Sequence, residues 1–188
     1  MANVKYGDSG QSWIRSTDDR MERNEYLSEI QKRFGNDWGK GRRFELPEHD
    51  VFFIPEIKMW SYIDGVRAYI YLYQHPPGRQ CSLDTVYELS NRGRDHSERF
   101  RGGTKWFRTF ATMTVIAVIS DSGFSNAAEE FVKKTKLMKV AELCFPVLID
   151  LSAERITILE KFGFIGRLPV KKQAKGLKKF FTLWRTRQ

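Results

Sequence analysis

Two β-rich runs joined by an Asp-Gly pair constrain the fold more than any other feature of the sequence. The runs lie between Val51 and Gln74, and Asp64-Gly65 separates them. Asp-Gly is typical of a two-residue type I′ turn, which predicts a β-hairpin with Lys58 opposite Tyr71. Because side chains alternate along a strand, one face of this hairpin is apolar and the other carries aromatic and charged residues.

The aromatic face of the expected hairpin has two interpretations. Exposed, it is a stacking platform for unpaired bases, with cations for the phosphates. Buried, it is a second core layer beneath a helix. Strands covered on both faces are usual in α/β domains, which favours burial. The members of this face are Trp60, Tyr69, Tyr71 and Tyr73, interleaved with Lys58 and Arg67.

Further along the chain, a continuous β-branched run from Thr114 to Ser120 indicates a strand buried on both faces. Ser125 is placed to cap a helix over Asn126 to Lys136, and the next strand, interrupted by Pro146, is expected within Val140 to Leu151. The sequence thus predicts an α/β (or α+β) fold. We expect a mixed central sheet with an N-terminal β-hairpin, flanked by helices, and a basic amphipathic C-terminal helix.

The positive charge excess of the chain is confined to its C-terminal segment. Residues 161–188 hold nine of the 32 Lys and Arg and no acidic residue, which leaves 23 basic against 23 acidic residues in the first 160. Such segregation makes a local field that concentrates polyanions, of which phosphate backbones are the commonest. The candidate binding residues in this segment are Lys171, Lys172, Lys175, Lys178, Lys179 and Arg185.

The same segment has the pattern of an amphipathic helix. Its apolar residues follow one another at spacings of 4, 3, 4 and 3, with lysines on the intervening positions. This stripe must be buried, against either the domain or a membrane interface. Its members are Val170, Ala174, Leu177, Phe181 and Trp184.

A second and weaker basic segment follows a short helix expected over Leu83 to Leu89. Between Asn91 and Arg108 there are six basic and two acidic residues, with Gly102-Gly103 in the middle. This excess predicts a further polyanion contact. The candidate residues are Arg92, Arg94, Arg99, Arg101, Lys105 and Arg108.

The segment from Thr114 to Phe131 resembles the late strand and helix of the Mrr-like branch of restriction-endonuclease-like nucleases. In that family a hydrophobic strand ends in a small polar turn, followed by Gly-Phe-Ser or Gly-Phe-Thr and a helix; here residues 120–125 read Ser-Asp-Ser-Gly-Phe-Ser. The resemblance implies a mixed sheet flanked by helices, DNA as substrate, and metal-dependent phosphodiester hydrolysis.

The chemistry of that family requires an acidic residue and an Asp/Glu/Gln-x-Lys triplet, whose carboxylates hold Mg²⁺. Glu56-Ile57-Lys58 supplies such a triplet, and Asp50 is the preceding acid. The resemblance therefore implies Asp50, Glu56 and Lys58 as catalytic residues, with Asp50 and Glu56 as metal ligands. Mg²⁺ is the cofactor of an active enzyme, whereas a binding protein needs none. The alternative for Glu56 and Lys58 is an ion pair on a solvated sheet.

Two classes of function stay open from the sequence. The first is a nucleic-acid-binding protein of restriction-endonuclease-like character, with DNA as partner in preference to RNA, as a monomer or a homodimer. The second is a non-enzymatic protein that attaches to an anionic membrane surface or a protein partner, with Phe180, Phe181 and Trp184 in the interface.

The start of the sequence lacks the pattern of a signal peptide, and its longest apolar run, Met113 to Ile119, is too short for a membrane span. We expect an intracellular protein, peripheral to a membrane in the second class. The expected organisation is a flexible N-terminus over 1–17, one α/β domain over 18–166, and the basic helix over 167–188.

Overall fold

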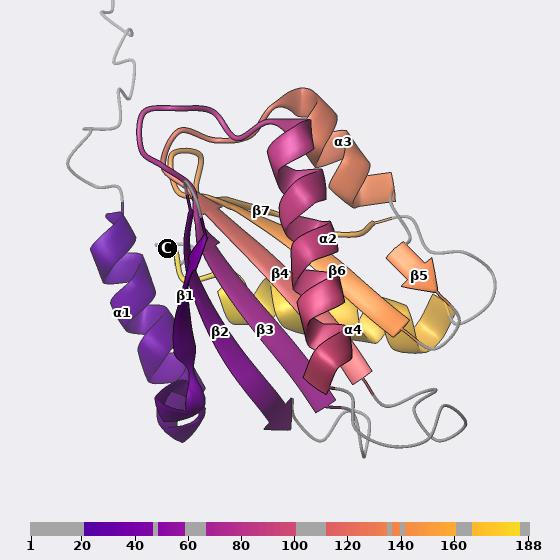
Figure 1. Ribbon diagram of the computed structural model, residues 1–188. Helices are drawn as coiled ribbons and strands as arrows, with labels where there is room; N and C mark the ends of the chain where they lie inside the picture. Colours follow the sequence, from indigo (N-terminus) through magenta and orange to yellow (C-terminus); the bar gives the residue numbers. More distant parts are fainter. Residues whose placement is uncertain are drawn as a thin grey trace, which may run out of the picture.

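The computed structural model describes residues 21–46, 49–58, 67–100, 112–134, 137–139, 142–160 and 167–184. No helix in these ranges is long and apolar enough to cross a membrane. Figure 1 shows the elements, which in chain order are α1 (Arg23–Phe34), the 3-10 helix η2 (Gly35–Lys40), β1 (Arg42–Leu46), β2 (His49–Lys58), β3 (Arg67–Gln74), α2 (Leu83–Phe100), β4 (Thr112–Ser120), α3 (Asn126–Lys134), β5 (Leu137–Lys139), β6 (Glu142–Asp150), β7 (Arg155–Thr157) and α4 (Arg167–Phe181).

One mixed sheet organises the described part of the chain. Its strands run in the order β1-β2-β3-β4-β6-β5, with β7 paired to β6. β3, β4 and β6 are parallel to one another, whereas β1-β2, β2-β3 and the pairings of β5 and β7 with β6 are antiparallel. The predicted α/β class with a mixed central sheet is confirmed.

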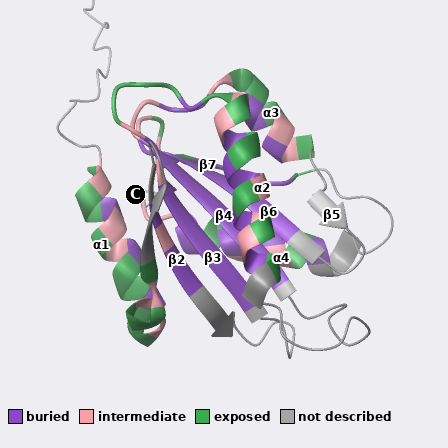
Figure 2. Cartoon of the chain, in the orientation of Figure 1, coloured by how far each residue is buried: buried purple, intermediate pink, exposed green. Residues whose placement is uncertain are grey.

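Helices cover both faces of this sheet. α2 and α3 pack in front of it in the view of Figure 1 and α4 lies behind it, while α1 shares the core of the α4 side. Figure 2 shows that the described central strands are buried while the outer sides of the helices are exposed. The β-branched strand β4 serves both cores, because Val115 and Ile119 face α4 and Val118 faces α2.

The register between β2 and β3 differs from the predicted hairpin by four residues at Lys58 and by five at Phe53. Lys58 lies opposite Arg67, not opposite Tyr71, whose partner is Phe53. The pairing shifts between Ile54 and Ile57, where β2 carries one more residue than β3. The predicted register is therefore wrong. The turn at Asp64-Gly65 lies outside the described residues, as does Trp60.

Strand β6 continues through Pro146, although an interruption was expected there. Pro146 lies opposite Ile116 of β4. On its other side, β5 pairs only with residues 142–144 of β6 and β7 only with residues 148–150. Proline therefore occupies a stretch of this edge where the described strands form no ladder, so its missing N–H interrupts no ladder on that side.

Helix α2 is one 18-residue helix, where a helix of seven residues was expected. The helix begins at Leu83, as predicted. Its first turn is capped by Ser82, whose Oγ accepts from the backbone N–H of Thr85 at 3.2 Å. Gly93, a poor helix former, lies inside it because the helix is pressed onto the sheet there. A Cβ at Gly93 would lie 2.7 Å from Ile116 Cδ1 and 3.2 Å from the Tyr73 hydroxyl.

We expect Gly93→Ala to lower the free energy of unfolding by about 1 kcal/mol, because the overpacking of α2 exceeds the gain in helix propensity. Gly176→Ala is the matched control, since α4 has nothing within 4 Å of a Cβ there. That control should stabilise the protein by about 0.5–1 kcal/mol. Urea denaturation measures both, and equal effects of the two substitutions would show that α2 is not in tight contact with the sheet.

Candidate functional site

The residues proposed for metal-dependent catalysis do not converge. Asp50 and Glu56 both belong to β2, six residues apart, and Lys58 ends that strand. At a strand rise of about 3.3 Å per residue, Asp50 lies roughly 20 Å from Glu56 along the chain, far beyond the ~2.1 Å ligand distances of one Mg²⁺. The side chains of these three residues are outside the described set. Within that set, no group of three His, Cys, Asp or Glu is placed to hold a metal.

The tyrosines of β3 form a buried core layer beneath α2. Tyr69, Tyr71 and Tyr73 are 1–2% exposed. The Tyr71 hydroxyl lies 3.0 Å from His96 Nδ1 on α2, and burial raises the pKa of Tyr73 above its usual value. For these residues the buried interpretation is confirmed, and no stacking platform for bases exists on this part of the sheet.

The arginines of α2 are partly neutralised where the structure describes them. Arg92 pairs with Glu88 one turn earlier, and an Nη of Arg94 lies 3.3 Å from Asp95. Pairing of this kind removes much of the field that would attract a polyanion. Arg99 belongs to α2 with its side chain outside the described set, and Arg101, Lys105 and Arg108 are outside the described residues altogether.

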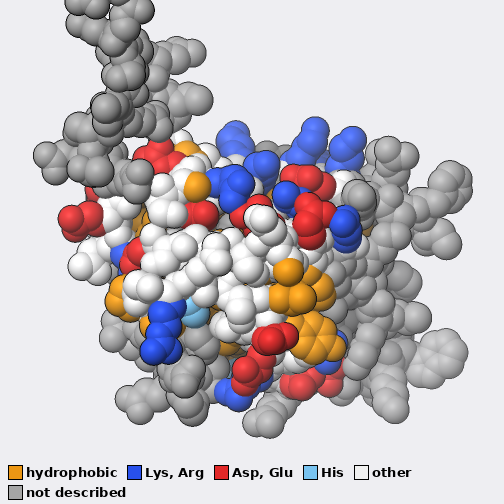
Figure 3. All heavy atoms as spheres, turned by 90° about the horizontal axis from the view of Figure 1, so that it is seen from above, with side chains coloured by type: hydrophobic (Ala, Val, Ile, Leu, Met, Phe, Trp, Pro, Cys, Tyr) orange, Lys and Arg blue, Asp and Glu red, His pale blue; other side chains and the backbone are white. Residues whose placement is uncertain are grey.

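Helix α4 carries a continuous basic surface, which we call the lysine face. Its five lysines are all exposed, and no described carboxylate forms an ion pair with Lys171, Lys175, Lys178 or Lys179. Figure 3 shows basic side chains along the edge of the molecule that lies at the back in Figure 1, the side on which α4 packs. The lysine face consists of Lys171, Lys172, Lys175, Lys178 and Lys179. Arg185 lies outside the described residues.

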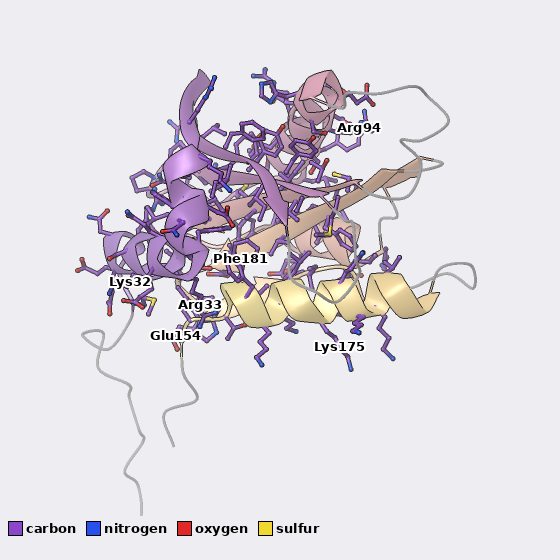
Figure 4. The ribbon with its side chains drawn as sticks, turned by 90° about the horizontal axis from the view of Figure 1, so that it is seen from below. Lys32, Arg33, Arg94, Glu154, Lys175 and Phe181 are labelled. Carbon is purple, nitrogen blue, oxygen red and sulfur yellow. The ribbon has the colours of Figure 1, made fainter. Side chains whose placement is uncertain are left out.

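The opposite side of α4 is buried against the domain. Val170, Ala174, Leu177 and Phe181 are at most 7% exposed and belong to the core that α1 and the sheet share. This confirms the predicted apolar stripe for these four residues and shows that the domain covers them, whereas its fifth member, Trp184, lies beyond the end of α4 and is half-buried. Figure 4 shows Lys175 pointing away from the body and Arg94 on the far side of the molecule, so the two basic segments face in opposite directions.

Helix α1 fixes the C-terminal end of α4. Tyr26 Oη donates to the carbonyl of Phe181 at 2.7 Å, and Arg33 Nη1 donates to the carbonyls of Lys179, at 3.1 Å, and Phe180. These carbonyls have no partner within the helix, and the cation of Arg33 lies at the negative end of the helix dipole. Sequence patterns did not reveal these contacts, since Tyr26 and Phe181 are 155 residues apart.

A buried charge cluster joins α3, β6 and β7. Glu129 and Asp150 are 6% and 5% exposed, Arg155 pairs with Glu129, and a guanidinium nitrogen of Arg155 lies 3.8 Å from Asp150 Oδ2. Asp150 Oδ1 also accepts from the Ser152 hydroxyl at 2.6 Å. Every carboxylate in the cluster is thus compensated, as a structural network requires. No pattern in the sequence indicated this cluster.

The cysteines of the chain show no sign of a reactive site. Neither Cys81 nor Cys144 forms a disulfide, and both side chains are buried. Burial raises the pKa of the Cys81 thiol to about 12, so the nucleophilic thiolate is scarce at neutral pH. The lysine face of α4 therefore remains the candidate functional site.

A scan against protein-family models found no match for this chain, and the searches of curated proteins and of solved structures found none either.

Proposed function

We propose that this chain binds the phosphate backbone of nucleic acid, with DNA preferred to RNA, through the lysine face of α4. The observation that supports it is a helix with five exposed lysines on one side, while its apolar side is held in the core. A fixed array of cations loses little conformational freedom in its backbone on binding and releases counterions from the phosphates. An intracellular location is part of the same proposal.

Catalysis is not part of the proposal. Asp50 and Glu56 stand six residues apart on one extended strand, so the described backbone does not support a shared Mg²⁺ site for the nuclease chemistry implied by the family resemblance. Binding through the lysine face needs no Mg²⁺ ligand from the protein.

Attachment to an anionic membrane is the alternative, and the packing of α4 favours it less. An interfacial helix inserts its apolar face between the headgroups. In this structure Phe180 and Phe181 are 8% and 0% exposed, and the ring of the half-buried Trp184 stacks on Tyr26 at 5.9 Å. These side chains are already engaged inside the domain.

The test replaces Lys171, Lys175 and Lys178 together by glutamine and measures binding to duplex DNA by fluorescence anisotropy at several salt concentrations. We expect affinity to fall roughly 10- to 100-fold at low salt, and the slope of log K against log salt to shrink by about 2.7, or 0.9 for each lost phosphate contact.

The matched control replaces three other exposed lysines, Lys32, Lys40 and Lys134, which pair with Glu29, Asp37 and Glu130. It removes the same charge from other places and should keep most of the affinity and the slope. Equal losses of affinity for DNA in both variants would show that binding depends on the net charge of the protein and not on the lysine face. Binding to anionic vesicles without binding to DNA would support the membrane alternative.

A further inference from the structure

We infer that the lysine face recognises double-stranded nucleic acid through both of its phosphate backbones, without preference for base sequence. This rests on the proposed function and adds the class of ligand. Three observations support it: the charge spacing on α4, the arrangement of its lysines in two rows, and the burial of the aromatic side chains around it.

The lysines of the lysine face lie closer together along the helix axis than the phosphates of one strand along a duplex. Lys171 to Lys179 span eight residues, about 12 Å of helix at 1.5 Å per residue. The five lysines divide that length into four intervals of ~3.0 Å on average, whereas successive phosphates along a duplex axis are 3.4 Å apart on one strand and 1.7 Å apart when both strands are counted. Over this length one strand of a duplex offers slightly fewer phosphates than there are lysines, and the two strands together offer enough for all five.

The lysines also form two rows along the helix. At 3.6 residues per turn, Lys171, Lys175 and Lys178 fall on one row, and Lys172 and Lys179 fall on a second, about 80° around the axis. Two rows that diverge from a convex helix suit two backbones on either side of a groove. The major groove, about 12 Å wide, matches an α-helix in size.

Base stacking, on which single-strand binding depends, finds few available aromatic side chains among the described residues near the lysine face. The Phe180 ring packs against Phe34 with centroids 4.8 Å apart, and the Trp184 ring stacks on Tyr26. The tyrosines of β3 lie on the other face of the sheet, beneath α2.

The lysine face also offers little means of reading base edges. Sequence is read mainly by bidentate Arg, Asn or Gln side chains, whereas lysine on a phosphate fixes position without reading sequence. The one amide within this stretch of α4, Gln173, is half-buried. We therefore expect the affinity for duplex nucleic acid to be independent of its base sequence.

The experiment compares two 20-bp duplexes of unrelated sequence with one of their single strands, using the full chain and the Lys171, Lys175 and Lys178 triple glutamine variant. We expect the duplexes to bind at least 10-fold tighter than the single strand and within about threefold of each other, with a log-log salt slope up to about −4.5, from five contacts at 0.9 each.

The outcomes separate the two proposals. A single strand that binds as tightly as the duplex, and loses affinity equally in the triple variant, would leave the lysine face as the site and overturn the duplex inference. A strong difference between the two duplex sequences would also overturn it. Absence of binding to every nucleic acid overturns the proposed function itself, and binding to anionic vesicles in the same assay would then identify a membrane ligand.

Discussion

Phe181→Ala is expected to lower the free energy of unfolding by about 3–5 kcal/mol, the usual cost of deleting a buried phenyl ring. The Phe181 side chain is fully buried in the core between α4, α1 and the sheet, and its ring meets Phe180 edge-to-face with centroids 5.1 Å apart. Its own carbonyl accepts from Tyr26, so the backbone is held and the cavity cannot readily close. Urea denaturation followed by circular dichroism measures the loss.

Lys179→Ala is the matched control, because Lys179 lies in the same turn of α4 with its side chain exposed. It should change the free energy of unfolding by less than about 0.5 kcal/mol. A loss below about 1 kcal/mol for Phe181→Ala would mean that α4 is only loosely docked. The apolar stripe would then be available to a membrane, which would favour attachment to an anionic membrane surface.

Arg155→Ala is expected to destabilise the protein by about 2 kcal/mol. Removing one partner from a fully buried ion pair costs about 3–5 kcal/mol, because the other charge stays buried without compensation. Arg155 is 53% exposed, which reduces its contribution, whereas Glu129 and Asp150 are almost inaccessible to water. Lys133, with Nζ 3.7 Å from Glu129 Oε2, compensates part of the remaining charge.

A double-mutant cycle with Glu129→Gln tests this explanation. A neutral amide needs no counter-charge, so Arg155→Ala should cost less in the Glu129→Gln background than in the wild-type protein. The sum of the losses in free energy of unfolding for the two single variants should therefore exceed the loss for the double variant. Strictly additive losses, measured by urea denaturation at fixed salt, would show that the two side chains do not interact energetically.

The parts of the fold that follow from local patterns could be predicted. The β-branched composition of residues 114–120 gave a strand buried on both faces, because no polar side appears in its alternation. The exposed and buried faces of α4 could be predicted because helical periodicity alone places its lysines on one face and its apolar residues on the other. The Ser125 cap predicted the start of α3, where Ser125 Oγ accepts from the N–H of Ala128 at 3.3 Å.

The parts that depend on distant contacts could not be predicted. A turn signal such as Asp64-Gly65 is local, whereas the β2-β3 register is set by how the whole strands fit the cores, and the irregularity between Ile54 and Ile57 moved it. The separation of Asp50 from Glu56 has a related cause, since an extended strand holds residues that are close in sequence far apart in space. Gly93 disfavours a long α2 because glycine has a low helix propensity. The close approach of α2 to Ile116 nevertheless requires glycine at this position, and this contact cannot be read from the local sequence.

The contacts that α1 makes with the end of α4 also set an order of events during synthesis. Tyr26 leaves the ribosome long before Phe181, and the two must meet across 155 residues. Until residues 167–181 have emerged, the face of the sheet that carries Ile70, Val115 and Val147 lacks the buried side chains of α4, and α1 is the one described α-helix that can cover it. A nascent chain therefore exposes part of this apolar face to solvent, and such transient exposure favours aggregation.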